Sequence, residues 1–239
     1  MPRAAREEVE PNSDAPAPTD TTPRGDDGSV ITEAELLSAV TAAFDLTGRG
    51  FDPWPDPHAG GAPHDDEYSR VTDPERWRII GARADAWLAG LADLDLAAVE
   101  RDVEVDWRSL TTVISRADRA VPPLAGALPL VVARSRIAEA DDAGITLGVG
   151  DPALGVSWFP HCGCDACDSG SGDELDRLDQ QILSIVTGRF RRLSQGDSEI
   201  TVLREGSWSA NLSVRRAVRV LADPTGWAEI SGPTWLGDA

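Results

Sequence analysis

Apolar and polar residues recur with a helical period in the first part of the chain. In the stretch TEAELLSAVTAAFDL, which starts at Thr32, leucine, valine and phenylalanine side chains fall on one helical face. Thr32 and Glu35 have the spacing of a capping box, in which each side chain accepts the other residue's backbone N–H. The pattern predicts a first helix over residues 33–45.

A second helix is predicted after a long loop rich in Gly and Pro, which contains His58 and His64. Thr72 or Asp73 is the expected cap, and Pro74 suits the first helical turn. The residues on its apolar face are Trp77, Ile80, Ala84, Trp87, Leu88 and Leu91. This face predicts a helix that packs into the core.

From about residue 99 the apolar pattern shortens to the alternation typical of strands. The candidate strands before the cysteines are VEVDW, TTVIS, LPLVVARSRI, ITLGVG and LGVSWF, and those after them are FRRLS, EITVLRE and WSANLSV. Between the two groups, Ser171 and Glu174 form a second capping-box pattern and Gly188 is a natural stop, which predicts a helix over 172–187. RRAVRVLAD predicts a short helix, and the end of the chain reads as irregular.

Strands that follow one another without helices between them pair antiparallel. The predicted fold class is therefore α+β: an antiparallel β-sheet of about six to eight strands, with helices packed mainly on one face. Residues 1–29 lack apolar periodicity and are predicted to be a disordered acidic, Pro-rich tail. Residues 30–239 are predicted to form a single α+β domain, with a helical part over 30–95 and a sheet-rich part over 99–239.

Composition restricts the function. The formal net charge is -19, which argues against binding nucleic acid or an anionic membrane and allows a basic protein partner; solubility alone also explains it. All 22 basic residues are arginine, so no Schiff-base or phosphate-loop lysine exists. With no signal-peptide pattern and no apolar run of membrane-spanning length, a cytoplasmic location is predicted.

The three cysteines of the chain lie together in the segment HCGCDACD, beginning at His161. Cys164 and Cys167 have the CxxC spacing that lets two sulfurs converge on one ion. Cys162 lies two residues before Cys164, so in an extended segment both point to the same side, whereas His161 points away from Cys162. A Cys3His set is a common zinc site, which makes these four residues the predicted metal ligands.

The identity of the fourth ligand is open among His161, Asp165, Asp168, His58 and His64. A redox dithiol is a weaker interpretation, because the many acids around the cysteines are expected to disfavour thiolates unless a cation is bound. A metal ion offsets this negative charge. A partly buried turn without any ligand is the third interpretation.

Arginines alternate along two neighbouring predicted strands. Arg116, Arg119, Arg134 and Arg136 either line an anion-binding face or pair with nearby acids on an exposed face, and the second interpretation is favoured.

The segments WFPHCGCDACDSGSGDELDRLD, HDDEYSRVTDPERWR and ADPTGWAEISGPTWL resemble those of an uncharacterised family, a domain of unknown function from high-GC Gram-positive bacteria. The likeness extends over most of the chain from about residue 31, and the motif CGCDACDSG is its most specific part. This resemblance implies no activity, fold or ligand.

The sequence thus favours a non-enzymatic cytoplasmic protein with a structural zinc site. The alternatives are a thiol oxidoreductase or metal-dependent hydrolase that uses the CGCDAC stretch, and an acidic protein that binds a basic partner.

Overall fold

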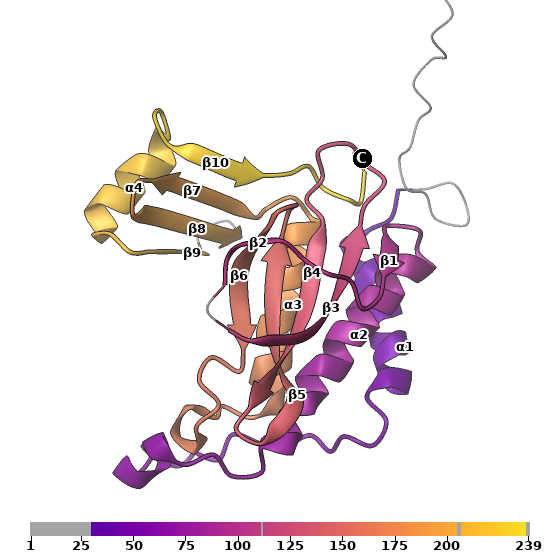
Figure 1. Ribbon diagram of the computed structural model, residues 1–239, viewed down its shortest axis with the longest axis vertical. Coiled ribbons are helices and arrows are strands. Elements are labelled where there is room, and N and C mark those ends of the chain that lie inside the picture. The colour runs from indigo at the N-terminus through magenta and orange to yellow at the C-terminus, as the bar shows by residue number, and fades with distance from the viewer. Residues whose placement is uncertain (1–29, 111, 205–206, 238–239) are drawn as a thin grey trace, which may run out of the picture.

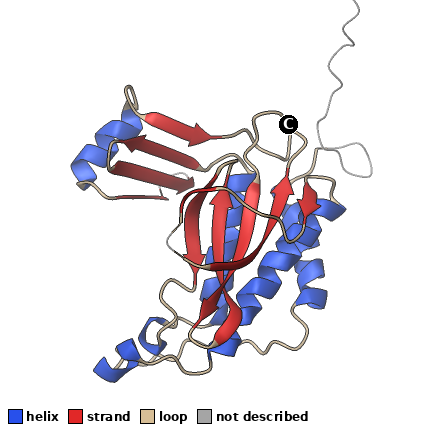
Figure 2. Ribbon diagram, in the orientation of Figure 1, coloured by secondary structure: helices blue, strands red, loops and turns tan. Residues whose placement is uncertain are grey.

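The computed structural model describes residues 30–110, 112–204 and 207–237, and shows an α+β fold with two β-sheets (Figures 1 and 2). The larger sheet has six strands in the order β1-β3-β4-β5-β6-β2, and the smaller has four in the order β10-β7-β8-β9. The larger sheet consists of β1 (Ala98–Glu100), β2 (Trp107–Ser109), β3 (Ile114–Val121), β4 (Leu130–Ile137), β5 (Ala140–Val149) and β6 (Ala153–Phe159). The smaller consists of β7 (Arg191–Gln195), β8 (Ser198–Arg204), β9 (Ser207–Ala210) and β10 (Ala228–Ser231). The predicted tail over 1–29 lies outside the described residues.

The prediction of one antiparallel sheet is wrong in two respects. The strands form two sheets, and the larger one is mixed because β2 pairs with β6 in parallel, with Trp107 beside Ala153. The chain between β1 and β2 passes across the larger sheet to its far edge, so β2 arrives in the same direction as β6 (Figure 1). Alternation along a strand identifies the strand but not its partner.

Three long helices cover one face of the larger sheet, and a fourth packs on the smaller (Figure 1). They are α1 (Glu33–Thr47), α2 (Arg78–Asp93), α3 (Ser171–Val186) and α4 (Val214–Ala222). Short 3-10 helices occur at η1 (Asp65–Ser69), η2 (Pro74–Trp77) and η3 (Asp165–Cys167). The main core lies between α1, α2, α3 and the larger sheet, and all six residues of the predicted apolar face of α2 are at most 1 % exposed.

The other face of the larger sheet is covered by the segment that leads into β2. Ala117, Val131 and Ala133 are buried there, with the Trp107 side chain packed against them. The Trp107 ring approaches Gly148 so closely that a Cβ atom at that position would lie 2.7 Å from it. The absence of a side chain at Gly148 therefore allows this irregular segment to pack against the larger sheet.

The helix ends and strands predicted from short sequence patterns agree with the structure in part. The Thr32–Glu35 capping box is confirmed. The predicted box at α3 is wrong: the helix begins at Ser171 itself, and the Ser171 hydroxyl bonds the backbone of Trp54 instead. β10 was not predicted, because its short AEIS stretch shows little apolar alternation.

Candidate metal centre

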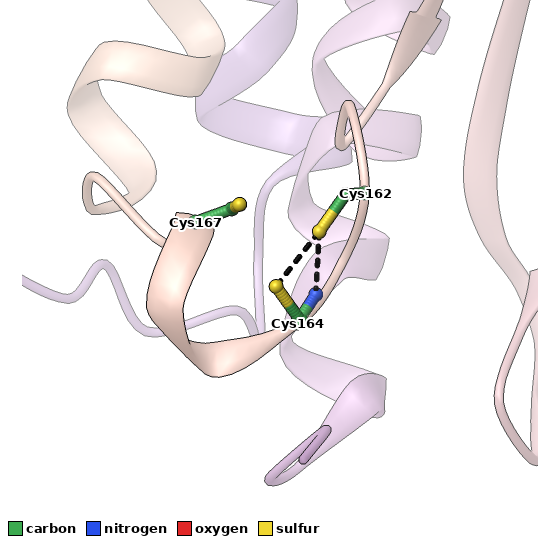
Figure 3. Close-up of side chains that lie close together, drawn as sticks. All are labelled: Cys162, Cys164 and Cys167. Atoms are coloured by element: carbon green, nitrogen blue, oxygen red, sulfur yellow. Dashed lines mark hydrogen bonds between the residues drawn. The ribbon is translucent and has the colours of Figure 1, made fainter. Parts of the chain in front are cut away.

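The three cysteines lie on the loop that joins β6 to α3 (Figure 3). Their sulfur atoms all lie within 4.8 Å of one another. The Cys162 thiol donates to the Cys164 sulfur over 2.8 Å, and the backbone N–H of Cys164 donates to the Cys162 sulfur over 3.3 Å. Cys164 is buried and the other two are exposed, and none forms a disulfide. The Cys162 and Cys164 sulfurs do come together, but through a turn and not in the extended segment on which that prediction depended.

Two local features bring the sulfurs together. Gly163 has a φ of +78°, a left-handed conformation that reverses the chain between Cys162 and Cys164 and that residues with a Cβ rarely adopt. The single turn η3 then returns Cys167 to the other two, with its backbone N–H bonded to the Cys164 carbonyl. The thiols are thus positioned by backbone geometry within six residues.

The cysteine thiols differ in acidity. Burial opposes ionisation of Cys164, but hydrogen bonds from the Cys162 and Cys167 thiols and from the backbone N–H groups of Cys167 and Ala166 outweigh it and lower its pKa. Bonds to Cys162 and Cys164, with partial removal from water, raise the pKa of Cys167 to about 12. These shifts in pKa come from the neighbouring thiols, backbone N–H groups and burial, so the expected effect of the nearby acids stays a prediction.

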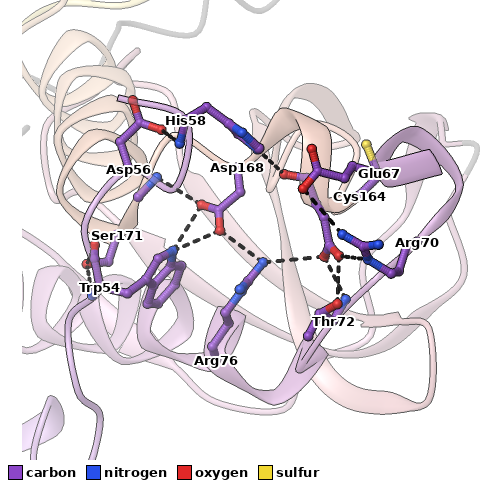
Figure 4. Close-up of polar contacts among 12 residues, drawn as sticks. Trp54, Asp56, His58, Glu67, Arg70, Thr72, Arg76, Cys164, Asp168 and Ser171 are labelled. Carbon is purple, nitrogen blue, oxygen red and sulfur yellow. Dashed lines mark hydrogen bonds and ion pairs between the residues drawn. The ribbon is translucent and has the colours of Figure 1, made fainter. Parts of the chain in front are cut away.

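Two acids of the cysteine segment, Asp165 and Asp168, are held by residues of the long loop between α1 and α2 (Figure 4). The Asp165 carboxylate accepts the backbone N–H and the hydroxyl of Thr72, each over 2.6 Å, and the Nε of Arg70 over 2.7 Å. Burial opposes its ionisation, but these donors lower the pKa of Asp165 to about 2. This acid is therefore ionised and neutralised by its partners.

Asp168, which follows Cys167 directly, is held in the same way. Its fully buried carboxylate accepts the indole N–H of Trp54 over 2.9 and 3.0 Å and the backbone N–H of Gly170 over 2.8 Å, and it pairs with Arg76 over 2.9 Å. The Arg76 guanidinium also lies over the Trp54 ring, 5.4 Å from its centroid. Asp168 thus joins two distant points of the long loop between α1 and α2.

We call this set of contacts the acidic clasp. On one side it contains Asp165, Asp168 and Ser171, and on the other Trp54, Arg70, Thr72 and Arg76. The backbone of the long loop comes so close to Gly170 that a Cβ atom there would lie 2.6 Å from the Asp56 nitrogen. The clasp therefore fixes the long loop directly against the cysteine turn.

The structure places the predicted ligands as follows. The three cysteines come together, but no histidine or carboxylate within the described part of the chain joins their group. The His161 ring stacks on Trp158, with centroids 5.4 Å apart and planes 19° apart, and it does not belong to the group of close ligand atoms that the cysteines form. His58 lies beside the turn, where its Nε2 bonds the Asp165 carbonyl over 2.9 Å, and His64 is exposed at the start of η1.

Sequence reasoning missed the partners of Asp165 and Asp168. The sequence offered one signal: the segment HDDEYSRVTDPERWR and the cysteine motif both carry the family resemblance. The structure brings these two segments into contact. Arg70, Thr72 and Arg76 come from the first segment and both aspartates from the second.

A family model described as "Family of unknown function (DUF6226)" matches residues 40–234. The chain belongs to this family. The part matched by the DUF6226 model includes both sides of the acidic clasp and all three cysteines. Searches of curated proteins and of solved structures returned no match. Among the described residues of this DUF6226 chain, no helix is long and apolar enough to cross a membrane.

Proposed function

We propose that this protein is a non-enzymatic metal-binding protein in which Cys162, Cys164 and Cys167 hold a zinc ion that has a structural role. The observation that carries the proposal is the convergence of three free thiols within 4.8 Å on one short turn. Thiolate sulfur is a preferred ligand of zinc, with a bond length of about 2.3 Å. Two sulfurs bound to one tetrahedral zinc ion lie about 3.8 Å apart at that bond length. Side-chain rotations that move Cys162 away from Cys164, now 2.8 Å apart, and keep Cys167 near them would give this spacing.

The three neighbouring sulfurs support a cation at this position. Cys164 already has a lowered pKa, and a bound ion favours the thiolate form of each ligand. The proposal places the protein in a reducing compartment such as the cytoplasm, because oxidised cysteines do not bind zinc. His161 remains the predicted fourth ligand, and its ring would have to leave Trp158 to reach the ion.

The structural role follows from the sequence of the turn. Asp165 lies between Cys164 and Cys167, and Asp168 follows Cys167 directly. An ion bound to both sulfurs therefore fixes the backbone conformation of this segment, and with it the positions of both carboxylates of the clasp. Metal binding at the turn is thereby coupled to docking of the long loop between α1 and α2. The free energy of metal binding then adds to the stability of the folded state.

Elemental analysis of the full-length protein, purified under reducing conditions, tests the proposal. One zinc ion per chain is expected, and Cys164→Ser and Cys167→Ser are expected to lose it. Ser169→Ala is a matched control, because it alters the same turn without removing a sulfur. His161→Ala tests the fourth ligand by its effect on zinc affinity. Absence of bound metal in the reduced wild-type protein, with no uptake of added zinc, would overturn the proposal.

Limited proteolysis tests the structural role separately. Trypsin cuts after arginine, and Arg70 and Arg76 both belong to the clasp. Removal of zinc by a chelator is expected to accelerate cleavage at these two sites, whereas cleavage at Arg215 and Arg216 on the distant helix α4 serves as the internal control. Equal protection with and without zinc would show that the ion does not fix the loop.

A further inference from the structure

A second site lies away from the cysteines, between α2, the end of α1 and the larger sheet. A cavity of about 300 Å³ opens there. The charged side chains that line it are Arg78, Arg116, Arg134, Asp85, Asp141 and Asp142. Cavities that bind small molecules measure about 300 to 1,000 Å³ and hold a few convergent polar groups, so this one suits a ligand of few atoms.

Arg134 is the residue that points to a ligand. Its side chain is 2 % exposed, yet its Nη1 atom has no hydrogen-bond acceptor among the residues that the structure describes. Its Nη2 atom donates to Asp85 over 2.6 Å and to the Gly81 carbonyl over 3.3 Å. A buried donor without an acceptor is unfavourable, because it has lost its bond to water. Arg134 lines the cavity, so a ligand bound there is in a position to supply an acceptor for its guanidinium group.

Other charged side chains around the cavity already form ion pairs with one another or with neighbouring residues. Arg116 donates to Asp142 over 3.1 Å, and Asp85 also accepts Arg101 over 3.3 Å. With three arginines and three aspartates in the wall, the site offers no net attraction to a polyanion or to a simple cation. It does offer separate partners for one negative and one positive group on the same small molecule.

We propose that this cavity binds a small zwitterion, a free amino acid, whose carboxylate is held by Arg134 and whose ammonium group is held by the aspartates at the cavity wall. Arg116 and Arg134 are two of the arginines that the alternation placed on neighbouring strands, and their positions on β3 and β4 are directly paired. The exposed face predicted for Arg134 is wrong, because its side chain is 2 % exposed, whereas that of Arg116 is 39 % exposed. Both pair with acids, Arg134 with Asp85 and Arg116 with Asp142, as the favoured interpretation predicts. Arg119 and Arg136 do pair with acids, namely Glu100 and Asp141, as that interpretation predicts.

Gly81 supplies a variant that alters the cavity without disturbing the fold. A Cβ atom at this position would lie 3.6 Å from the Arg134 Nε and 3.7 Å from the Ile145 side chain, which are ordinary contact distances. Alanine is also a better helix former than glycine. Gly81→Ala should therefore fold normally and place a methyl group against the guanidinium. Gly172→Ala is its matched control, since it makes the same change in α3, where a Cβ atom meets no atom within 4 Å.

Isothermal titration calorimetry of the full-length protein with each of the twenty amino acids tests the proposal. At least one is expected to bind with a dissociation constant below about 1 mM. For that amino acid, the N-acetyl derivative lacks the ammonium group and the amide lacks the carboxylate, and each is expected to bind at least about tenfold more weakly. Inorganic phosphate is expected not to bind.

Three variants test whether the amino acid binds in the cavity. Arg134→Met is expected to weaken binding at least about tenfold and Gly81→Ala severalfold, while Gly172→Ala leaves binding unchanged. Three results would overturn the proposal: no binding of any amino acid, binding of either derivative as tightly as the parent amino acid, or equal binding by Gly81→Ala and wild type. Because Gly81→Ala is expected to keep the fold, the test holds even if Arg134→Met does not fold.

Discussion

The acidic clasp and the cavity beside α2 are built from the same residue types, arginine and aspartate, but they differ in what surrounds the buried charge. In the clasp, the buried carboxylates of Asp165 and Asp168 each accept bonds from three groups. Each site keeps a buried guanidinium nitrogen without a described acceptor, Nε of Arg76 in the clasp and Nη1 of Arg134, but Arg134 lines a cavity of about 300 Å³. We infer that a cluster whose carboxylates are fully bonded holds two parts of the chain together, whereas buried charge beside a cavity leaves a place for a ligand.

The strongest test of this comparison is Asp168→Ala. The substitution leaves the Trp54 indole N–H and the partly buried Arg76 without their acceptor, so a loss of about 3 kcal/mol in the free energy of unfolding is expected. Asp176→Ala removes an exposed acid from the same region and is expected to change stability by less than about 0.5 kcal/mol. Urea denaturation of both variants measures the difference, and equal costs would mean that the clasp contributes nothing.

Asp165→Asn tests the other carboxylate of the clasp through pH. The pKa of Asp165 is lowered to about 2 from its ordinary value of 3.8, so its ionised form stabilises the folded state above about pH 4. This contribution, about 2 kcal/mol, is lost as the pH falls from about 4 to about 2.

The Asp165→Asn variant should therefore be less stable than wild type at pH 7, and the difference should shrink over that acidic range. Stability curves measured by denaturant from pH 7 to pH 2 provide the check. A difference that stays constant with pH would contradict the assigned role of the carboxylate.

A smaller effect is expected from Arg134→Met. The substitution removes the bond to Asp85, but Asp85 keeps Arg101, and the unbonded Nη1 disappears with the side chain. A loss of about 1 kcal/mol is expected, compared with about zero for Arg136→Met, whose exposed side chain forms an ion pair with Asp141 on the surface. Thermal unfolding compares the two. A loss for Arg134→Met as large as that for Asp168→Ala would remove the distinction between the clasp and the cavity.

Much of the fold was predictable because its signals are local. The apolar face of α2 recurs every three to four residues, and the capping box before α1 spans four residues, so neighbouring positions carried the information. The convergence of the cysteines was predictable for the same reason, since Cys164 and Cys167 are separated by one short turn. The predictions about nucleic acid, membranes, a basic partner and the fourth metal ligand stay predictions.

The chain's own sequence determined the helices, most strands and the grouping of three thiols, because these depend on residues a few positions apart. Only the tertiary structure decided that β2 lies beside β6 and that the strands divide into two sheets. It also decided which distant residues bind the cysteine segment. Asp165 accepts a hydrogen bond from Arg70, 95 positions away, and Ser171 bonds the backbone of Trp54, 117 positions away. The physical reason is that a hydrogen-bonding or charged side chain has many possible partners along the chain, and packing of the core selects which of them come within reach.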